Sequence, residues 1–289
     1  MGGTSIEHVR PGDHACLVFT DSEERLDIVA AFVRDGLRAG QRVICLTEAI
    51  PEAGLADELA RRGLNISAAR QDGQLQVVDS GKFFVPQGSF DPERVIGEVR
   101  KALASASRDG YQGLRITCDM GWALRPVSGL SDLPAYESRL TALLGADNAT
   151  AVCQFDRQRF DTITISTALE GHTCAVAAVT YHDDALLRIC RQHVPPGIRV
   201  AGELDYRAVD ALTTAMTEAL SLDAHIDVNL AHLRFLDTMA AGVIVQAAVG
   251  LSNGQRMTVR CQPVPYKIFD TLGLREIPEV TLRMVRHDH

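Results

Sequence analysis

The first 180 residues alternate short apolar segments with longer amphipathic ones, and this pattern limits the possible folds most strongly. Apolar runs of strand length lie at residues 15–19, 42–46, 75–78, 114–118 and 149–153, and segments with helical periodicity separate them. Parallel strands need a long crossover connection, which is usually a helix. The alternation therefore predicts an α/β domain with a mostly parallel sheet and helices on both faces.

A second pattern begins near residue 184. Two strand-like segments at 186–190 and 198–201 flank a Pro-Pro-Gly turn, and further strand and helix signals continue to residue 284. This pattern predicts a second α/β domain with a mixed sheet. We place the two domains at residues 1–182 and 183–289, joined by a linker near Tyr181–Asp184.

Composition excludes several classes of function. A formal net charge of −8 disfavours general nucleic-acid binding through phosphate contacts. No apolar run reaches the roughly 18 residues of a membrane span, and the N-terminus lacks the apolar core of a signal peptide. The seven cysteines include no CxxC pair, so we expect buried thiols rather than disulfides or a structural zinc site. We therefore expect a cytoplasmic protein without direct nucleic-acid or membrane partners.

Three segments of the second half, taken in order, resemble the STAS domain of bacterial anti-anti-sigma factors. They are Gly202-Glu-Leu-Asp205, then Phe235-Leu-Asp-Thr238 after a strand ending in Asn229-Leu230, and finally Pro263 to Leu274. The resemblance implies a STAS-type fold that binds a serine-protein-kinase/anti-sigma factor. The implied partner-binding residues are Gly202, Glu203, Asp205, Asp237, Thr238 and Met239.

Thr238 matches the residue that is phosphorylated in that family. A phosphate adds about −1.5 to −2 charge, which Asp205, Asp237 and an acidic or apolar partner surface would disfavour. Phosphorylation should therefore break a complex. The other interpretation is helix capping by Asp237 or Thr238, and by Asp205 for a helix that begins at Tyr206. This chain departs from the family after Thr238, where Met239-Ala240 replaces the usual hydroxyl residue and Gly.

The first half resembles the MEDS domain, a sensory module related to the RecA/KaiC-like ATPase fold. The match runs over about residues 6–180. It rests on Pro11-Gly-Asp-His14, Gly36-Leu37, Gly40, Phe90-Asp-Pro92, Gly110 to Arg115, Asp119-Met-Gly-Trp122, Tyr136-Glu137, Cys153-Gln-Phe-Asp156 and Phe160.

The MEDS resemblance implies sensing of a small hydrocarbon-like molecule. The candidate ligand-binding residues are His14, Asp119, Trp122, Glu137 and Asp156. Because strand ends in such sheets converge on one edge, we expect His14, Asp119 and Asp156 to form a polar cluster or a weak metal site. The alternatives are a turn role for His14, core packing for Trp122 and a pocket-covering helix for Glu137. Asp119 stands where the family usually has Glu.

The features of a P-loop ATPase are missing from the sequence. Such an enzyme would carry GxxxxGK[ST] after its first strand, whereas this chain has Thr20-Asp-Ser-Glu-Glu24. The only Gly-Lys pair, Gly81-Lys82, is followed by Phe83. We also find no nucleophile–base arrangement and interpret His172 as structural. We therefore expect no P-loop ATP hydrolysis, no cofactor and no enzymatic activity.

Our first hypothesis is a signalling regulator, an anti-sigma factor antagonist that joins a sensory domain to a STAS domain. Phosphorylation at Thr238, together with ligand binding or homodimer contacts in the first half, would control its partner. A second hypothesis is a nucleotide- or ligand-binding RecA-like protein or enzyme that uses the STAS domain for docking. A third is a scaffold in which Thr238 serves only as a cap.

Overall fold

The computed structural model describes residues 3–285, which divide between Ala177 and Ala178 into two compact units. The sheet of the N-terminal unit has the strand order β3-β2-β4-β5-β1-β6, and all of its pairings are parallel. Its strands are β1 (His14–Phe19), β2 (Arg42–Thr47), β3 (Leu75–Asp79), β4 (Leu114–Asp119), β5 (Ala149–Asp156) and β6 (Cys174–Val176). The predicted parallel sheet is confirmed.

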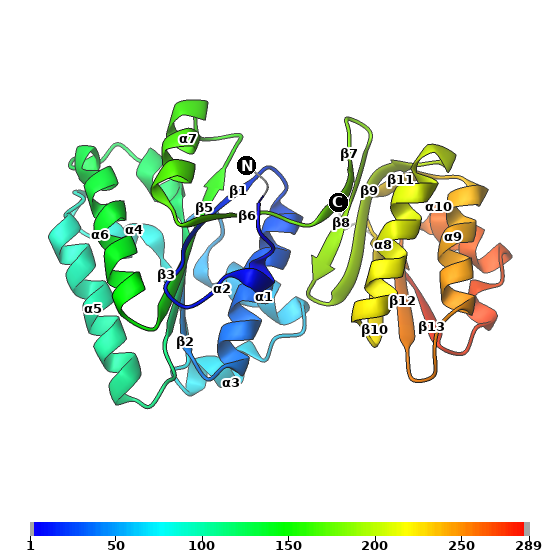
Figure 1. Cartoon of the computed structure of the whole chain (residues 1–289), viewed down its shortest axis with the longest axis horizontal. Coiled ribbons are helices and arrows are strands. Elements are labelled where there is room, and N and C mark those ends of the chain that lie inside the picture. The colour runs from blue at the N-terminus through cyan, green and yellow to red at the C-terminus, as the bar shows by residue number, and fades with distance from the viewer. Residues whose placement is uncertain (1–2, 286–289) are drawn as a thin grey trace. The chain divides into compact units, whose positions relative to one another are not determined.

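Helices cover both faces of this sheet, as predicted. Figure 1 shows α1 on one side of the sheet and α5 with α6 on the other. The helices are α1 (Ser22–Arg38), α2 (Glu52–Arg61), α3 (Ile66–Gln71), α4 (Ser80–Phe84), α5 (Pro92–Arg108), α6 (Leu133–Ala146) and α7 (Thr162–Gly171), with 3-10 turns η1 (Ile6–His8), η2 (Met120–Leu124) and η3 (Leu130–Asp132). The face under α5 and α6 is apolar and includes Cys16, Ile116 and Cys153.

The loop after β1 explains why α1 begins at Ser22. The Asp21 carboxylate accepts hydrogen bonds from the backbone N–H groups of Glu23, at 2.8 Å, and Glu24, at 3.0 Å. In a P-loop protein, N–H groups at this position hold phosphate. Here a carboxylate occupies them, which agrees with the missing P-loop sequence.

The C-terminal unit has a mixed sheet in the order β13-β12-β10-β9-β8-β7, and β11 also pairs with β9. The β7–β8 and β8–β9 pairings are antiparallel, and the remaining pairings are parallel. The strands are β7 (Thr180–Asp183), β8 (Leu187–His193), β9 (Pro196–Leu204), β10 (His225–Leu230), β11 (Leu233–Leu236), β12 (Arg256–Cys261) and β13 (Val280–Met284). The predicted mixed sheet is confirmed.

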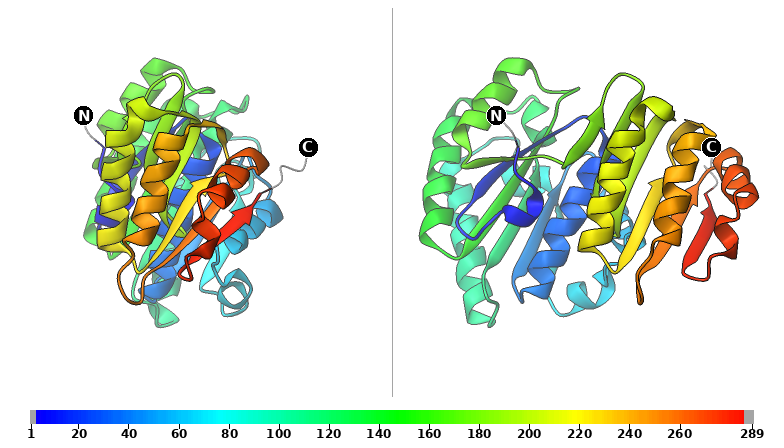
Figure 2. Two further views of the ribbon diagram at one scale, coloured as in Figure 1. Left: turned by 90° about the vertical axis from the view of Figure 1, so that its right-hand side faces the viewer. Right: turned by 45° about the vertical axis from the view of Figure 1, so that its right-hand side comes forward.

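The helices of this unit bury the apolar face of its sheet. Figure 2 shows α8 and α9 side by side on that face. The helices are α8 (Val209–Leu222), α9 (Thr238–Val249) and α10 (Pro263–Thr271), with 3-10 turns η4 (Tyr206–Ala208) and η5 (Leu274–Glu276). The core includes Val200, Val228, Met216, Ile244 and Phe269.

One expected connection is instead a strand. Tyr181–Asp184, which we expected to be a linker, lies mostly in β7 because Thr180, His182 and Asp183 pair with β8. Within the described part of the chain, no helix has both the length and the apolar character needed to span a bilayer.

Candidate functional site

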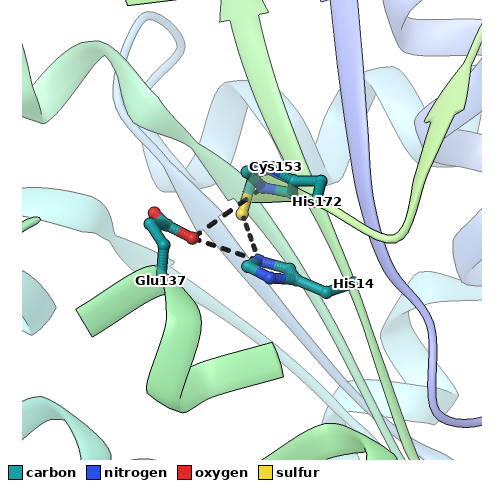
Figure 3. Close-up of side chains that lie close together, drawn as sticks. All are labelled: His14, Glu137, Cys153 and His172. Atoms are coloured by element: carbon teal, nitrogen blue, oxygen red, sulfur yellow. Dashed lines mark hydrogen bonds and ion pairs between the residues drawn. The ribbon is translucent and has the colours of Figure 1, made fainter. Parts of the chain in front are cut away.

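Four side chains that can bind metals meet inside the N-terminal unit: His14, Glu137, Cys153 and His172 (Figure 3). His14 is the first residue of β1 and pairs in register with Ala151, so its side chain shares a sheet face with Cys153 of β5. Glu137 projects from α6, which packs on that face, and His172 directly follows α7. Four separate elements therefore build this cluster.

The polar atoms of the cluster are within contact distance. His14 Nε2 lies 3.3 Å from Cys153 Sγ and 3.3 Å from Glu137 Oε2. His172 Nε2 lies 3.8 Å from the same Glu137 oxygen. The two imidazole rings are tilted against each other with centroids 4.0 Å apart.

Neighbouring groups fix the tautomers of both histidines. His172 Nδ1 lies 2.6 Å from the Ala168 carbonyl oxygen, which only accepts, so Nδ1 carries the proton. The Thr141 hydroxyl donates its proton to the Glu137 carbonyl, so it must accept from His14 Nδ1 at 2.8 Å. Both Nε2 atoms therefore present lone pairs toward the cluster.

Burial shifts the pKa values in this cluster toward neutral forms. It raises the pKa of Glu137 to about 8 and that of the Cys153 thiol well above its usual value. Burial, and secondarily His172, lowers the pKa of His14 to about 2, and burial lowers the pKa of His172. Burial therefore disfavours the charged forms of both His14 and Glu137, despite their short distance.

A cavity of about 480 Å³ opens beside the cluster, between α6 and α7. Glu137 and His172 form part of its wall, and most of the remaining lining is apolar, including Leu133, Phe155 and Ile163. A cavity that is mostly apolar with a few converging polar groups is typical of small-molecule sites. Another cavity, of about 400 Å³ near Gln112 and Asn148, includes none of the four cluster residues.

The structure does not bring His14 together with Asp119 and Asp156. His14 begins β1, whereas Asp119 ends β4 and Asp156 ends β5, and these strands belong to one parallel sheet. Starts and ends of parallel strands lie at opposite edges, so that expectation was wrong. Asp156 instead closes a turn by accepting the N–H of Gln158. Of the candidate residues, only Glu137 lies beside His14.

Asp119 belongs to a separate buried network. Its carboxylate accepts a hydrogen bond from Arg25 at 2.8 Å and from the backbone N–H groups of Ala49 and Gly121, each at 3.0 Å. Arg25 also donates to Gln154 Oε1 at 2.6 Å. These partners satisfy Asp119 and hold it at the carboxyl end of β4.

Trp122 lies in the core, the alternative that we considered for it. Its side chain has no exposed surface, and its ring stacks on Phe84 with centroids 4.4 Å apart. Phe90 and Tyr136 complete this aromatic group. Trp122 does not line the cavity beside the cluster.

The C-terminal unit presents the start of α9 at its surface. Asp237 is the cap: its carboxylate accepts the N–H of Ala240 at 2.8 Å and that of Tyr206 at 2.7 Å. Thr238 is the first residue of α9, is exposed, and makes no hydroxyl hydrogen bond within residues 3–285. Asp205 caps η4 and pairs with Arg207, which lowers the pKa of Asp205.

Exposed apolar side chains surround this helix start. Tyr206, Phe235 and Met239 are 63%, 53% and 65% exposed. Phe235 pairs in register with Glu203, which is also exposed. Gly202 has a φ of +109°, and a Cβ there would lie 1.9 Å from the Leu186 carbonyl oxygen, so only glycine fits. We refer to Gly202, Glu203, Asp205, Tyr206, Phe235, Asp237, Thr238 and Met239 as the α9 surface.

Sequence reasoning missed two members of the buried cluster. Cys153 is in a segment that carries the MEDS resemblance, but a cysteine in an apolar strand is usually a small core residue. His172 has no sequence neighbour that indicates a metal or catalytic role. The spacing between residues 14 and 172 carries no local signal, and only the fold shows that they are neighbours.

These features define a two-domain α/β protein with a cavity beside a polar cluster in one domain and an exposed helix start in the other. Residues 13–173 match the MEDS family, described as the methanogen/methylotroph, DcmR sensory domain, and residues 191–288 match the STAS domain. The chain therefore belongs to the MEDS family and carries a STAS domain fused to it. Both resemblances drawn from the sequence are confirmed.

One individual relative matches this chain over part of its length. The transcriptional repressor DcmR of Methylorubrum extorquens (strain DSM 6343 / CIP 106787 / DM4) is 26% identical over 163 residues, which are 55% of this chain and 58% of the repressor. The chain thus spans less than two thirds of that relative.

Two solved structures share a similar chain path. A KaiC-like protein from the archaeon Pyrococcus horikoshii OT3 has a TM-score of 0.46 at 12% identity, covering 66% of this chain and 85% of its own. The flagellar accessory protein FlaH from Methanocaldococcus jannaschii has a TM-score of 0.45 at 12% identity, covering 68% and 87%. Because these likenesses are weak, we base the fold on strand order and helix placement.

Proposed function

We propose that the protein is an anti-sigma factor antagonist. Its STAS domain binds a serine-protein-kinase/anti-sigma factor through the α9 surface, and phosphorylation of Thr238 releases that partner. The MEDS domain biases this interaction by binding a small molecule. A regulatory role is supported by the sensory description of the MEDS family and by the repressor among its relatives.

The observation that carries this proposal is the division of roles between Asp237 and Thr238. Asp237 takes the capping hydrogen bonds, so the exposed Thr238 hydroxyl is not required for the helix start. It sits among exposed apolar side chains that a partner could cover. A phosphate there would be close to the Asp237 carboxylate and would need to be desolvated in a complex, which disfavours binding.

The test is binding of the full-length protein to candidate anti-sigma kinases from the same genome. We expect Thr238→Ala to bind like the wild type and Thr238→Asp to bind at least tenfold more weakly. Incubation with kinase, ATP and Mg²⁺ should place phosphate on Thr238, as mapped by mass spectrometry, and release the kinase.

The chain offers a matched control in its other domain. Thr162 is also an exposed first helical residue after a capping aspartate, Asp161, which accepts from Ile163 and Thr164. Thr162→Asp makes the same chemical change away from the α9 surface and should leave kinase binding intact. Equal binding by Thr238→Ala and Thr238→Asp would instead favour the scaffold hypothesis.

A further inference from the structure

The four cluster side chains direct ligand-type atoms toward one point, as Figure 3 shows. All four atoms lie within 4.8 Å of one another. Within the described residues, neither Glu137 carboxylate oxygen nor His172 Nε2 has a hydrogen-bond partner, although these atoms are buried. Buried polar atoms without partners are rare and costly, so this arrangement requires an explanation.

Hydrogen bonding within the cluster cannot supply the missing partners. The Cys153 thiol has one proton to give to His14 Nε2 at 3.3 Å. A protonated Glu137 has one proton to offer, but its Oε2 lies 3.8 Å from His172 Nε2, beyond hydrogen-bond range. With both imidazoles neutral, at least one imidazole lone pair therefore stays unmatched. A single cation at the centre would satisfy all four groups.

We propose that His14, Glu137, Cys153 and His172 bind one divalent ion of the zinc class. Zinc bonds to nitrogen, oxygen and sulfur of about 2.0 to 2.3 Å place tetrahedral ligand atoms roughly 3.3 to 3.7 Å apart. Three of the six distances in the cluster are 3.3, 3.3 and 3.8 Å, and all six are within 4.8 Å. One thiolate and one carboxylate also balance a charge of +2, so the loaded site is neutral. Magnesium and calcium prefer all-oxygen sites.

The surroundings match those of a metal centre in two further ways. Metal-bound histidines usually donate their second N–H to a fixed acceptor, as His14 does to Thr141 and His172 does to the Ala168 carbonyl. The cavity between α6 and α7 reaches Glu137 and His172 and gives an ion a route to the site. This inference concerns the MEDS domain alone and does not depend on the partner of the STAS domain.

The test is a cobalt titration of the full-length protein after treatment with a chelator. Co²⁺ should bind at one ion per chain, with the intense visible bands of a tetrahedral site and a thiolate-to-metal charge-transfer band. Zn²⁺ should then displace it and remove the colour. Every protein in these titrations, including the one called wild type, carries His287→Ala and His289→Ala, because closely spaced histidines can also bind these ions.

Three variants locate the ion. Cys153→Ala should remove the charge-transfer band and weaken zinc binding at least tenfold. Cys118→Ala, which changes a buried cysteine paired in register with Cys153 on the neighbouring strand, should leave the band unchanged. Thr141→Val should keep the band but weaken zinc binding about 10- to 100-fold, because Thr141 only orients His14.

Circular dichroism of each variant separates loss of the metal from loss of the fold. If a variant fails to fold, the wild-type titration still tests the inference by itself. A wild-type protein that takes up no stoichiometric Co²⁺ or Zn²⁺ would overturn the inference. A folded Cys153→Ala variant with an unchanged charge-transfer band would overturn it as well.

Discussion

At the scale of single residues, the buried pair of Arg25 and Asp119 is a point where one substitution should be costly. Their side chains are 5% and 6% exposed, and they approach to 2.8 Å. Asp119→Ala leaves the Arg25 charge buried without its carboxylate, which should cost about 3–5 kcal/mol of unfolding free energy. Chemical denaturation measures this loss. Asp109→Ala breaks the more exposed pair with Arg42 and should cost less than about 1 kcal/mol.

At the start of α9, Asp237 should contribute to the stability of the protein and Thr238 should not. Asp237→Ala removes the acceptor for the Ala240 and Tyr206 N–H groups and should cost about 1–2 kcal/mol. Thr238→Ala removes no hydrogen bond of the described residues and introduces a better helix former, so stability should not fall. Thermal denaturation of both variants tests this. A destabilised Thr238→Ala would mean that the hydroxyl, not Asp237, supports the helix.

At the scale of elements, the β7–β8 hairpin should respond to acid through Asp184. The Leu186 N–H, followed by the His182 side chain and the Leu187 N–H, lowers the pKa of Asp184 to about 2. Because this folded-state pKa lies below the ordinary value of 3.8, the carboxylate stabilises the hairpin above about pH 4, and the effect fades as pH falls toward 2.

The stability gap between wild type and Asp184→Ala should therefore be largest above about pH 5 and shrink as the pH falls from about 5 to 2. Urea denaturation at several pH values measures this gap. Asp183→Ala, which removes a neighbouring carboxylate paired with Arg188, is the control for a general loss of charge. A gap that stayed constant across this range would show that Asp184 acts only through backbone conformation.

The helices and strands also show how much of the fold could be predicted from the sequence. Periodicity located the strands and long helices because burial of one face imposes that pattern locally. It gave no sign of short pieces such as β6 and β7, which are strands only because β1 and β8 pair with them. The sequence did not predict the four-residue cluster for a related reason. His14 lies at a strand start, and its partners come from α6, β5 and the end of α7, so only tertiary packing joins them.

At the scale of the whole molecule, the STAS unit can serve as the internal reference in a test of metal binding by the MEDS unit. An ion that binds the folded MEDS domain stabilises it by about 4 kcal/mol when free metal exceeds its Kd a thousandfold. Hydrogen exchange of the full chain should then show slower exchange in peptides from residues 3–177 on adding Zn²⁺. Peptides from residues 178–285 should change less, because the cluster residues all lie in the first unit.

The Cys153→Ala chain is the control for this measurement and, at the same free Zn²⁺ concentration, should show weaker protection of residues 3–177 than the wild type. Protection confined to the STAS peptides would place the ion elsewhere and contradict the expectation. Equal protection of both units in the wild type would mean that they unfold together, so that metal in one domain stabilises the other. That coupling is what a sensor needs, because a ligand can shift the STAS domain only through a free energy that the two domains share.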